Sequence, residues 1–239
     1  MPLPLAQQSP DQLGGEASVL VRQRRDHGEL DRLMRLYEST DLPLSAQQAV
    51  LRDIFQLTFS HAFAEETVLW PALRRLAADG EELTSRVEAE HQQINDLAMA
   101  IESTDPHDRR HDQLVTAAFA LIREDIRDEE DVLLPRLQEA LKHDTARLRR
   151  LGSAWETVRR TAPTRPHPAV SRRPPGNALA GVPLSVFDRV RDLCADLCAP
   201  LRSHGRWTAA ALAAAALAAC LAGAAARRRS RRRPSSAHR

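Results

Sequence analysis

The sequence repeats itself at an offset of 64 residues, and this repeat constrains the fold more than any other feature of the chain. The first pair of matching motifs is Asp26-His27-x-x-Leu30 and Glu90-His91-x-x-Ile94. The second pair is His61-x-x-x-Glu65-Glu66-x-x-Leu69-x-Pro71 and Asp125-x-x-x-Glu129-Glu130-x-x-Leu133-x-Pro135. Because both pairs lie in segments with helical spacing, we expect two helix pairs related by a pseudo-twofold axis.

Apolar residues follow a helical period through most of residues 16–160, and strand patterns are almost missing. Long helices are predicted at residues 16–38, 45–78, 81–102 and 108–142, with a short fifth helix at 145–160. Short connections between them favour an all-α, antiparallel four-helix bundle with the fifth helix packed across it. The Ser-Ala-Gln-Gln that begins at Ser45 has the pattern of a capping box. The Pro-, Gln- and Gly-rich residues 1–15 are expected to form a flexible N-terminus.

Two of the predicted core stripes are interrupted by polar residues. Residues four apart share a helix face, so His61 and Glu65 fall on one stripe and Asp125 and Glu129 on another. The apolar members of these stripes are Val50, Ile54, Leu57 and Val68 in one helix and Leu114, Ala118, Leu121 and Val132 in the other. An unpaired buried carboxylate or imidazole is costly, so each interruption needs a partner.

A metal centre would provide that partner. The candidate ligands come from all four long helices and are His27, His61, Glu65, His91, Asp125 and Glu129. A lone histidine in an apolar stripe is more often a hydrogen-bonded core residue, but these residues occupy matched positions of the repeat. Imidazoles and carboxylates that converge inside a bundle suit a pair of iron ions, with manganese as the less favoured metal. Four further acids are predicted to lie on the solvated side, with a supporting position behind the metal ligands as the alternative: Glu66, Asp128, Glu130 and Asp131.

With these motifs, residues 15–160 resemble the hemerythrin HHE cation-binding domain. The resemblance rests on D-H-x-x-L, H-x-x-x-E-E-x-x-L-x-P, E-H-x-x-I and E-E-x-x-L-x-P, which are specific together and weak singly. It implies a non-haem di-iron site. His27, His61 and His91 would be terminal ligands, and Glu65 and Glu129 would be bridging carboxylates.

The sequence departs from the family pattern at Asp125, where the pattern has histidine. A carboxylate reaches less far than the distal nitrogen of an imidazole, and its charge favours the ferric state. Three outcomes follow: a shifted carboxylate-rich site, a water in the sixth place, or one weak metal position. Glu124 lies about 100° around the helix, and His111 lies about 21 Å along it, so neither replaces the missing histidine.

Such a centre is expected to bind dioxygen, peroxide or nitric oxide, for sensing, storage or detoxification. Weak peroxide-decomposing activity stays open, since no motif selects among these roles. One alternative is an iron-responsive regulatory or interaction module without turnover. Another is a metal-free structural bundle.

The C-terminal quarter has a different composition. Residues 161–182 are predicted to be a Pro-rich linker, 183–205 an amphipathic helix, 206–226 an Ala-rich hydrophobic helix and candidate membrane anchor, and 227–239 an Arg-rich tail. That tail carries seven arginines and no acid, and removing them from the net charge of +2 leaves −5. A mildly acidic remainder does not favour specific nucleic-acid binding. With no signal-peptide pattern, we expect a cytoplasmic domain attached to the inner membrane through residues 206–239. The alternative is an Ala/Arg-rich helix that is soluble or binds nucleic acid non-specifically through its basic tail.

Overall fold

The computed structural model describes residues 3–39 and 42–162, and in these ranges it is helical with no strand. The long helices are α1 (Val19–Glu38), α2 (Leu44–Ala64) continued by α3 (Trp70–Leu76), α4 (Gly80–Glu102), and α5 (Arg109–Asp128) continued by α6 (Leu134–Ala140). A last helix, α7, spans Thr145–Arg159, and a short 3₁₀ turn, η1, spans Leu5–Gln7. The predicted all-α bundle with a short fifth helix is therefore confirmed.

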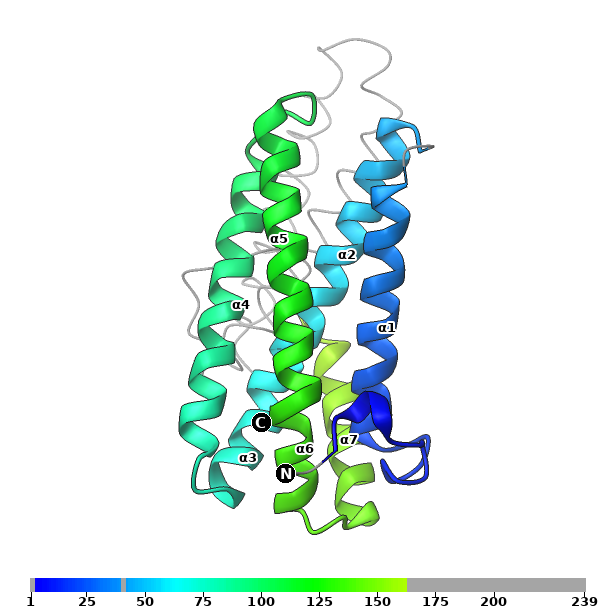
Figure 1. Cartoon of the computed structure of the whole chain (residues 1–239), viewed down its shortest axis with the longest axis vertical. Coiled ribbons are helices and arrows are strands. Elements are labelled where there is room, and N and C mark those ends of the chain that lie inside the picture. Colours follow the sequence, from blue (N-terminus) through cyan, green and yellow to red (C-terminus); the bar gives the residue numbers. More distant parts are fainter. Residues whose placement is uncertain (1–2, 40–41, 163–239) are drawn as a thin grey trace, which may run out of the picture. The chain divides into compact units, whose positions relative to one another are not determined.

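Four helical rods run antiparallel to one another, and α7 packs beside one end of them (Figure 1). In that end lie α3, α6 and α7, whereas the upper halves of α1, α2, α4 and α5 form the other end. The closest pairs are α1 with α2 and α4 with α5, so the contacts follow the sequence repeat.

Side chains cap three of the helices. Ser18, Asp108 and Asp144 each precede a helix and accept hydrogen bonds from its first backbone N–H groups. The second rod begins differently: α2 starts at Leu44 after Pro43, which has no side chain able to cap. The predicted capping box at Ser45 is therefore wrong, because Ser45 already lies inside the first turn.

Each of the two interrupted rods contains a π-helical turn. These turns are η2 (Glu65–Leu69) and η3 (Glu129–Leu133), and they occupy equivalent positions of the repeat. A proline follows each turn, at Pro71 and Pro135, where its ring would clash with the carbonyl four residues earlier and its missing N–H would break the α-helical ladder. Because a π turn adds a residue, Leu69 and Leu133 are fully buried, whereas the predicted stripe members Val68 and Val132 are only partly buried.

The buried apolar residues form two separate clusters. One cluster fills the α3–α6–α7 end and includes Trp70, Leu73 and Trp155. The other fills the opposite end and includes Ile54 and Phe119. In each rod the candidate metal ligands lie where the chain passes from one cluster to the other, with Ala64 of the first cluster between His61 and Glu65. The polar layer is therefore in the middle of the bundle.

The N-terminal segment packs against the bundle from Leu5 onward, contrary to the predicted flexible N-terminus. Leu5 and Leu13 are fully buried members of the α3–α6–α7 cluster. The Gln138 side chain donates hydrogen bonds to Gln8 Oε1 at 2.9 Å and to the Gln12 carbonyl at 2.8 Å. These apolar and polar contacts order a segment whose composition suggests a coil.

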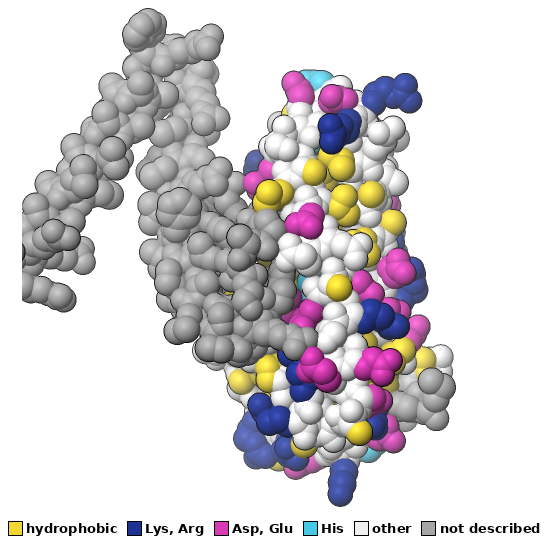
Figure 2. Space-filling view, turned by 90° about the vertical axis from the view of Figure 1, so that its left-hand side faces the viewer, with side chains coloured by type: hydrophobic (Ala, Val, Ile, Leu, Met, Phe, Trp, Pro, Cys, Tyr) yellow, Lys and Arg dark blue, Asp and Glu magenta, His cyan; other side chains and the backbone are white. Residues whose placement is uncertain are grey.

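Charged and apolar side chains are mixed on the bundle face seen in Figure 2, as is usual for a protein surface. Within the described residues no helix is long and apolar enough to cross a membrane. The predicted linker beyond residue 162, the amphipathic helix at 183–205, the candidate anchor at 206–226 and the tail at 227–239 lie outside the described residues.

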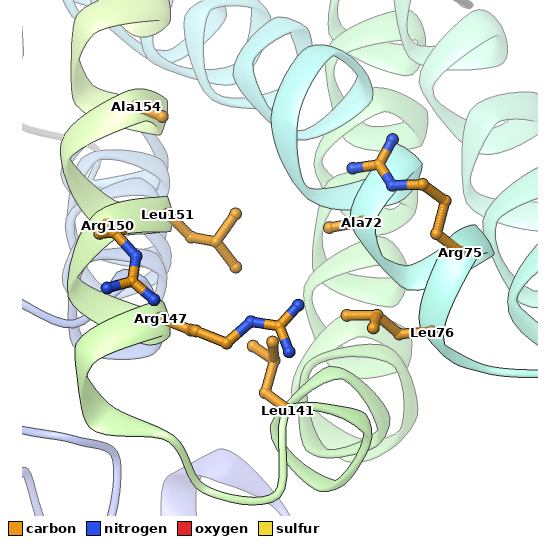
Figure 3. A pocket seen from close by; sticks show the side chains of 8 residues that line it. All are labelled: Ala72, Arg75, Leu76, Leu141, Arg147, Arg150, Leu151 and Ala154. Carbon is orange, nitrogen blue, oxygen red and sulfur yellow. The ribbon is translucent and has the colours of Figure 1, made fainter.

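Helix α7 approaches its neighbours closely on one side and leaves a cavity on the other. A Cβ atom at Gly152 would lie 2.6 Å from the Ala17 carbonyl oxygen, so only glycine fits where α7 meets the segment before α1. On the opposite side, a cavity separates α7 from α3 (Figure 3).

Candidate metal centre

All six candidate ligands lie in the polar layer and are buried. Their exposed fractions are 3% for His27, 5% for His61, 0% for Glu65, 2% for His91, 7% for Asp125 and 1% for Glu129. The four rods each contribute at least one of them, as the repeat predicts. The structure brings the six residues into two groups that share one carboxylate.

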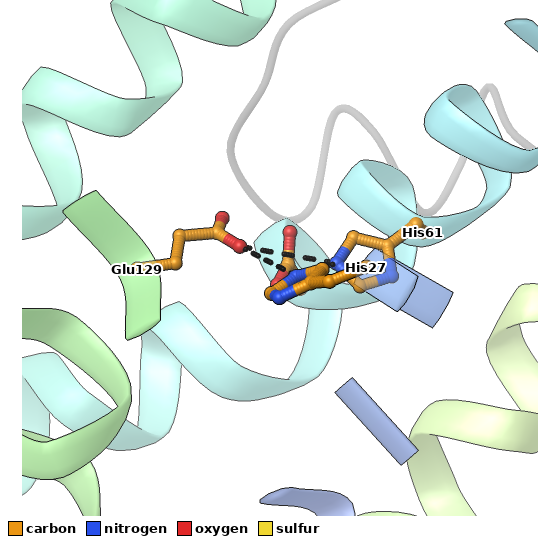
Figure 4. A group of neighbouring side chains, drawn as sticks. His27, His61 and Glu129 are labelled. Carbon is orange, nitrogen blue, oxygen red and sulfur yellow. Dashed lines mark hydrogen bonds and ion pairs between the residues drawn. The ribbon is translucent and has the colours of Figure 1, made fainter. Parts of the chain in front are cut away.

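The first group contains His27, His61, Glu65 and Glu129. His27 Nε2 lies 3.2 Å from Glu129 Oε2, and His61 Nε2 lies 3.1 Å from Glu65 Oε1. The two Nε2 atoms are themselves 3.1 Å apart, so both imidazoles face the same point (Figure 4). Two imidazole nitrogens and two carboxylates are thus placed around one position.

The second group contains His91, Asp125 and Glu129. His91 Nε2 lies 3.6 Å from Asp125 Oδ1 and 3.7 Å from Glu129 Oε1. Glu65 Oε2 is 3.8 Å from the same nitrogen. Glu129 therefore directs one oxygen to each group, and Glu65 lies between them. This half has one imidazole where the first half has two.

The outward-facing nitrogens of the three histidines all meet carboxylates. His27 Nδ1 lies 2.8 Å from Glu130, His91 Nδ1 lies 2.8 Å from Glu66, and His61 Nδ1 lies 3.4 Å from Asp26. Such contacts hold a proton on Nδ1, so that Nε2 is the nitrogen available to bind a metal ion.

The prediction that Glu66 and Glu130 lie on the solvated side is wrong. Glu66 is 1% exposed, and the Glu130 side chain is 16% exposed. The π turns begin at the preceding glutamates and change the direction in which these residues point. Glu66 and Glu130 are 64 residues apart and so occupy equivalent positions of the repeat, and the histidines that they contact are equivalent in the same way. This correspondence in the sequence could have identified the two acids as partners of the histidines.

Helix α7 closes the side of the layer that carries His61. The Trp155 ring meets the His61 ring edge-on, with 5.6 Å between centroids. Arg159 Nη1 lies 3.3 Å from Asp26 Oδ2, the same oxygen that contacts His61. Sequence reasoning assigned α7 only a packing role and did not identify these contacts.

The equivalent position in the other half lacks an imidazole. In the repeat Glu90 corresponds to Asp26 and Asp125 to His61, so an acid–histidine pair is replaced by two acids. Burial, followed by the charges of Asp125 and Asp128, raises the pKa of Glu90 to about 7. Burial and the charge of Glu129 also raise the pKa of Asp125. Glu124 is exposed and cannot take the ligand position, as predicted.

The imidazoles and carboxylates shift one another's pKa values strongly. Burial lowers the pKa of His27, but contacts with the carboxylates of Glu129 and Glu130 outweigh it and raise the pKa to about 9. Carboxylates raise the pKa values of His61 and His91 well above their usual range, again against burial. Burial would raise the pKa of Glu129, but the three histidines hold it well below its usual range. Burial and the charge of Glu129 raise the pKa of Glu65 to about 7.

Several carboxylate oxygens in the layer lack a hydrogen bond of good geometry. They are both oxygens of Glu65, both oxygens of Glu129 and Oδ1 of Asp125. A buried acceptor without a donor costs free energy, and a divalent cation satisfies several such oxygens at once. The donor set of imidazole nitrogen and carboxylate oxygen suits iron and related first-row metals. The residues present therefore fit a metal centre.

Apolar residues border the layer on the side facing the second cluster. Leu30, Ala62, Ile122 and Ile126 line a cavity of about 10 Å³ together with Thr58, the three histidines, Asp125 and Glu129. A cavity of this size holds about one water-sized molecule. Any exogenous ligand that binds without rearrangement is therefore very small.

Imidazoles and carboxylates inside an antiparallel four-helix bundle define a helical cation-binding protein. Residues 19–137 match the family described as the hemerythrin HHE cation binding domain. The chain belongs to this family through these residues, which confirms the resemblance noted in its motifs. Helix α7 lies beyond the matched region.

A related protein is known in yeast. Over 134 residues the chain is 23% identical to a hemerythrin-like protein of Schizosaccharomyces pombe. The alignment covers 56% of this chain and 65% of the yeast protein, so the chain spans less than two thirds of that relative. No solved structure gives a significant match.

Proposed function

We propose that the polar layer holds two non-haem iron ions and binds dioxygen, peroxide or nitric oxide. His27, His61, Glu65 and Glu129 would hold one ion. His91, Asp125 and Glu129 would hold the other, with Glu65 as the second bridging carboxylate. The observation that carries this proposal is the common orientation of the histidines: each Nδ1 faces an acid, and each Nε2 faces the orphaned oxygens.

A pair of iron ions supplies a redox couple and a coordination position for a small ligand. The residues around the cavity determine which small ligands can reach the metal position. Leu30, Ile122 and Ile126 give the cavity beside the ligands one apolar wall, and its volume of about 10 Å³ favours diatomic molecules and peroxide over larger substrates. Sensing, storage and detoxification are all compatible with such a site.

The two halves should bind metal unequally. The half that contains His27 and His61 offers two nitrogens, whereas the half that contains His91 and Asp125 offers one. Imidazole suits iron, and a carboxylate-rich set suits harder ions such as manganese. We expect the first iron ion to enter the two-imidazole half and the second position to be weaker.

Iron content and the visible spectrum of the full-length protein test this proposal. Two irons per chain, with oxo-bridged ferric bands that change on addition of azide or peroxide, are the expected result. Asp125→His should strengthen the second position, and Glu124→His, at an exposed position on the same turn, is the matched control. A folded protein that takes up no iron would overturn the proposal.

The second candidate function is an iron-responsive regulatory module without turnover. It is favoured by the position of the polar layer between two separate apolar clusters, because metal binding there would couple to folding. Peroxide consumption by the iron-loaded protein separates the two candidates. Iron-dependent folding without consumption would favour regulation.

Membrane attachment through residues 206–239 is a further part of the proposal. Its support is the length and composition of the Ala-rich segment between arginines. Cell fractionation of the full chain and of a chain ending at residue 205 tests it. If the two chains were divided equally between the membrane and soluble fractions, the proposed membrane attachment would be refuted.

A further inference from the structure

The cavity between α3 and α7 has the size of a small-molecule site. Its volume is about 340 Å³, at the lower end of the range of roughly 300–1,000 Å³ for ligand pockets. This cavity lies at the α3–α6–α7 end of the bundle, and it shares no lining residue with the small cavity beside the polar layer. It is therefore a separate site.

Three arginines surround this cavity (Figure 3). Arg147 and Arg150 come from α7, and Arg75 comes from α3 on the opposite wall. In the described part of the chain none of the three has an ion-pair partner. Nearby arginines differ: Arg74 binds Glu81 and Glu88, and Arg136 binds Asp79 and Glu139.

Arg147 lies near the N-terminus of α7, as the third residue of that helix. The Asp144 carboxylate caps this helix and accepts hydrogen bonds from the backbone N–H groups of Ala146 and Arg147, but it forms no ion pair with the Arg147 guanidinium. Basic side chains also gather at this end of the bundle in Figure 2. Several like charges around a cavity create a positive potential that attracts an anion.

The remaining walls are apolar. Leu76, Leu141, Leu151, Ala72 and Ala154 complete the lining. Leu76 is 36% exposed, although it faces the cavity with its neighbours. A purely inorganic anion would leave these apolar surfaces in contact with water, whereas a short hydrocarbon would cover them.

We propose that this cavity binds a small amphiphilic anion. Its carboxylate or phosphate head would accept hydrogen bonds from Arg75, Arg147 and Arg150, since guanidinium groups match both head groups in bidentate geometry. Its short apolar body would pack against Leu76, Leu141 and Leu151. The proposal goes beyond metal binding and does not depend on it.

Calorimetric titration of the full-length protein with octanoate, octyl phosphate, octanol and inorganic phosphate tests the proposal. We expect octanoate or octyl phosphate to bind at least about tenfold more tightly than octanol or inorganic phosphate. Arg147→Gln and Arg150→Gln should each weaken that binding about tenfold. Arg149→Gln is the matched control, because Arg149 is exposed on the same helix but does not line the cavity. Thermal melting confirms that each variant folds.

Other outcomes would overturn the proposal. Equal binding of octanol and octanoate would mean that the arginines do not select an anion. Equal binding of inorganic phosphate and octyl phosphate would mean that the leucines make no contribution. An undiminished affinity in the Arg147→Gln, Arg150→Gln double variant would place the ligand elsewhere. Binding to anionic lipid vesicles without binding of soluble octanoate would indicate a membrane surface instead of a ligand site.

Discussion

Metal uptake at the polar layer should release protons, because the surrounding carboxylates raise the pKa values of its histidines and so favour their protonated forms. Contacts with carboxylates raise the pKa of His27 to about 9 and those of His61 and His91 well above their usual range. A metal ion coordinates only the neutral imidazole, so each coordinated histidine must first lose a proton. The experiment is therefore the addition of ferrous iron to the metal-free protein.

The pKa values set the number of protons. At about pH 7.5, a group with the pKa of His27 is about 97% protonated, and the raised pKa values of His61 and His91 act in the same direction. Burial raises the pKa of Glu65 to about 7, so Glu65 adds about a quarter of a proton. His27 and Glu65 alone account for slightly more than one proton, so full loading should release more than one proton per chain, and the overall affinity should rise at least about tenfold per pH unit in this range.

Anaerobic calorimetry in buffers of different ionisation enthalpy counts these protons. Glu129→Gln should reduce the number, because Glu129 is the carboxylate that contacts all three histidines. Glu124→Gln, at an exposed position nearby, should leave it unchanged. Release of less than about one proton at saturating iron would refute the reasoning, since the histidines would then be neutral in the metal-free protein.

The same shifts give the metal-free protein a pH-dependent stability. The pKa of His27 is raised from 6.5 to about 9, so its stabilisation is complete below pH 6.5 and is lost as the pH rises through 9. This shift corresponds to an upper limit of about 3 kcal/mol. Glu65 acts in the same direction between 4.5 and about 7. Urea unfolding of metal-free protein should show lower stability at about pH 9 than at about pH 6.

Other substitutions test the surroundings of the centre. Glu66→Ala removes the acceptor of one Nδ1–H and should weaken iron binding about 10–100-fold, whereas Glu82→Ala on the surface should not. Asp125→His should make the two ions bind with similar affinities in an iron titration, and a persistent difference would mean that another residue causes the inequality. Arg159→Met should weaken iron binding by up to about tenfold, with partial recovery in Arg159→Lys, because the cation holds a carboxylate against a histidine. Gly152→Ala should lower the free energy of unfolding by about 1–3 kcal/mol in denaturant titrations, since its Cβ would lie 2.6 Å from a carbonyl oxygen; no change would show that α7 can shift.

Much of the bundle could be predicted because local signals agreed with one another. Turn residues such as Pro43, Gly80 and Pro106 separate long helical patterns, and the observed helix ends differ from the predicted ones by only a few residues. The repeat also identified the six residues that converge in the polar layer. Their convergence follows from helix periodicity and antiparallel packing, both of which are encoded locally.

The parts that could not be predicted depend on tertiary contacts. A π turn changes which residues face inward, and helix periodicity alone therefore placed Glu66 and Glu130 in solvent. The N-terminal segment has a coil-like composition, yet burial of Leu5 and Leu13 orders it. The contact between Trp155 and His61 joins residues distant in sequence, and no short motif encodes it.

The polar layer separates two apolar clusters, and this division has a consequence for cooperativity. Without metal, the part of the bundle around each cluster is expected to unfold locally and independently of the other part. Amide hydrogen exchange measures such local unfolding. Ligands on all four rods would tie these units together, much as a cross-link does. Iron would then couple the two ends of the bundle. Without iron, amides at the two ends should exchange at different rates; with iron, they should exchange slowly and at one common rate, because both ends must unfold together.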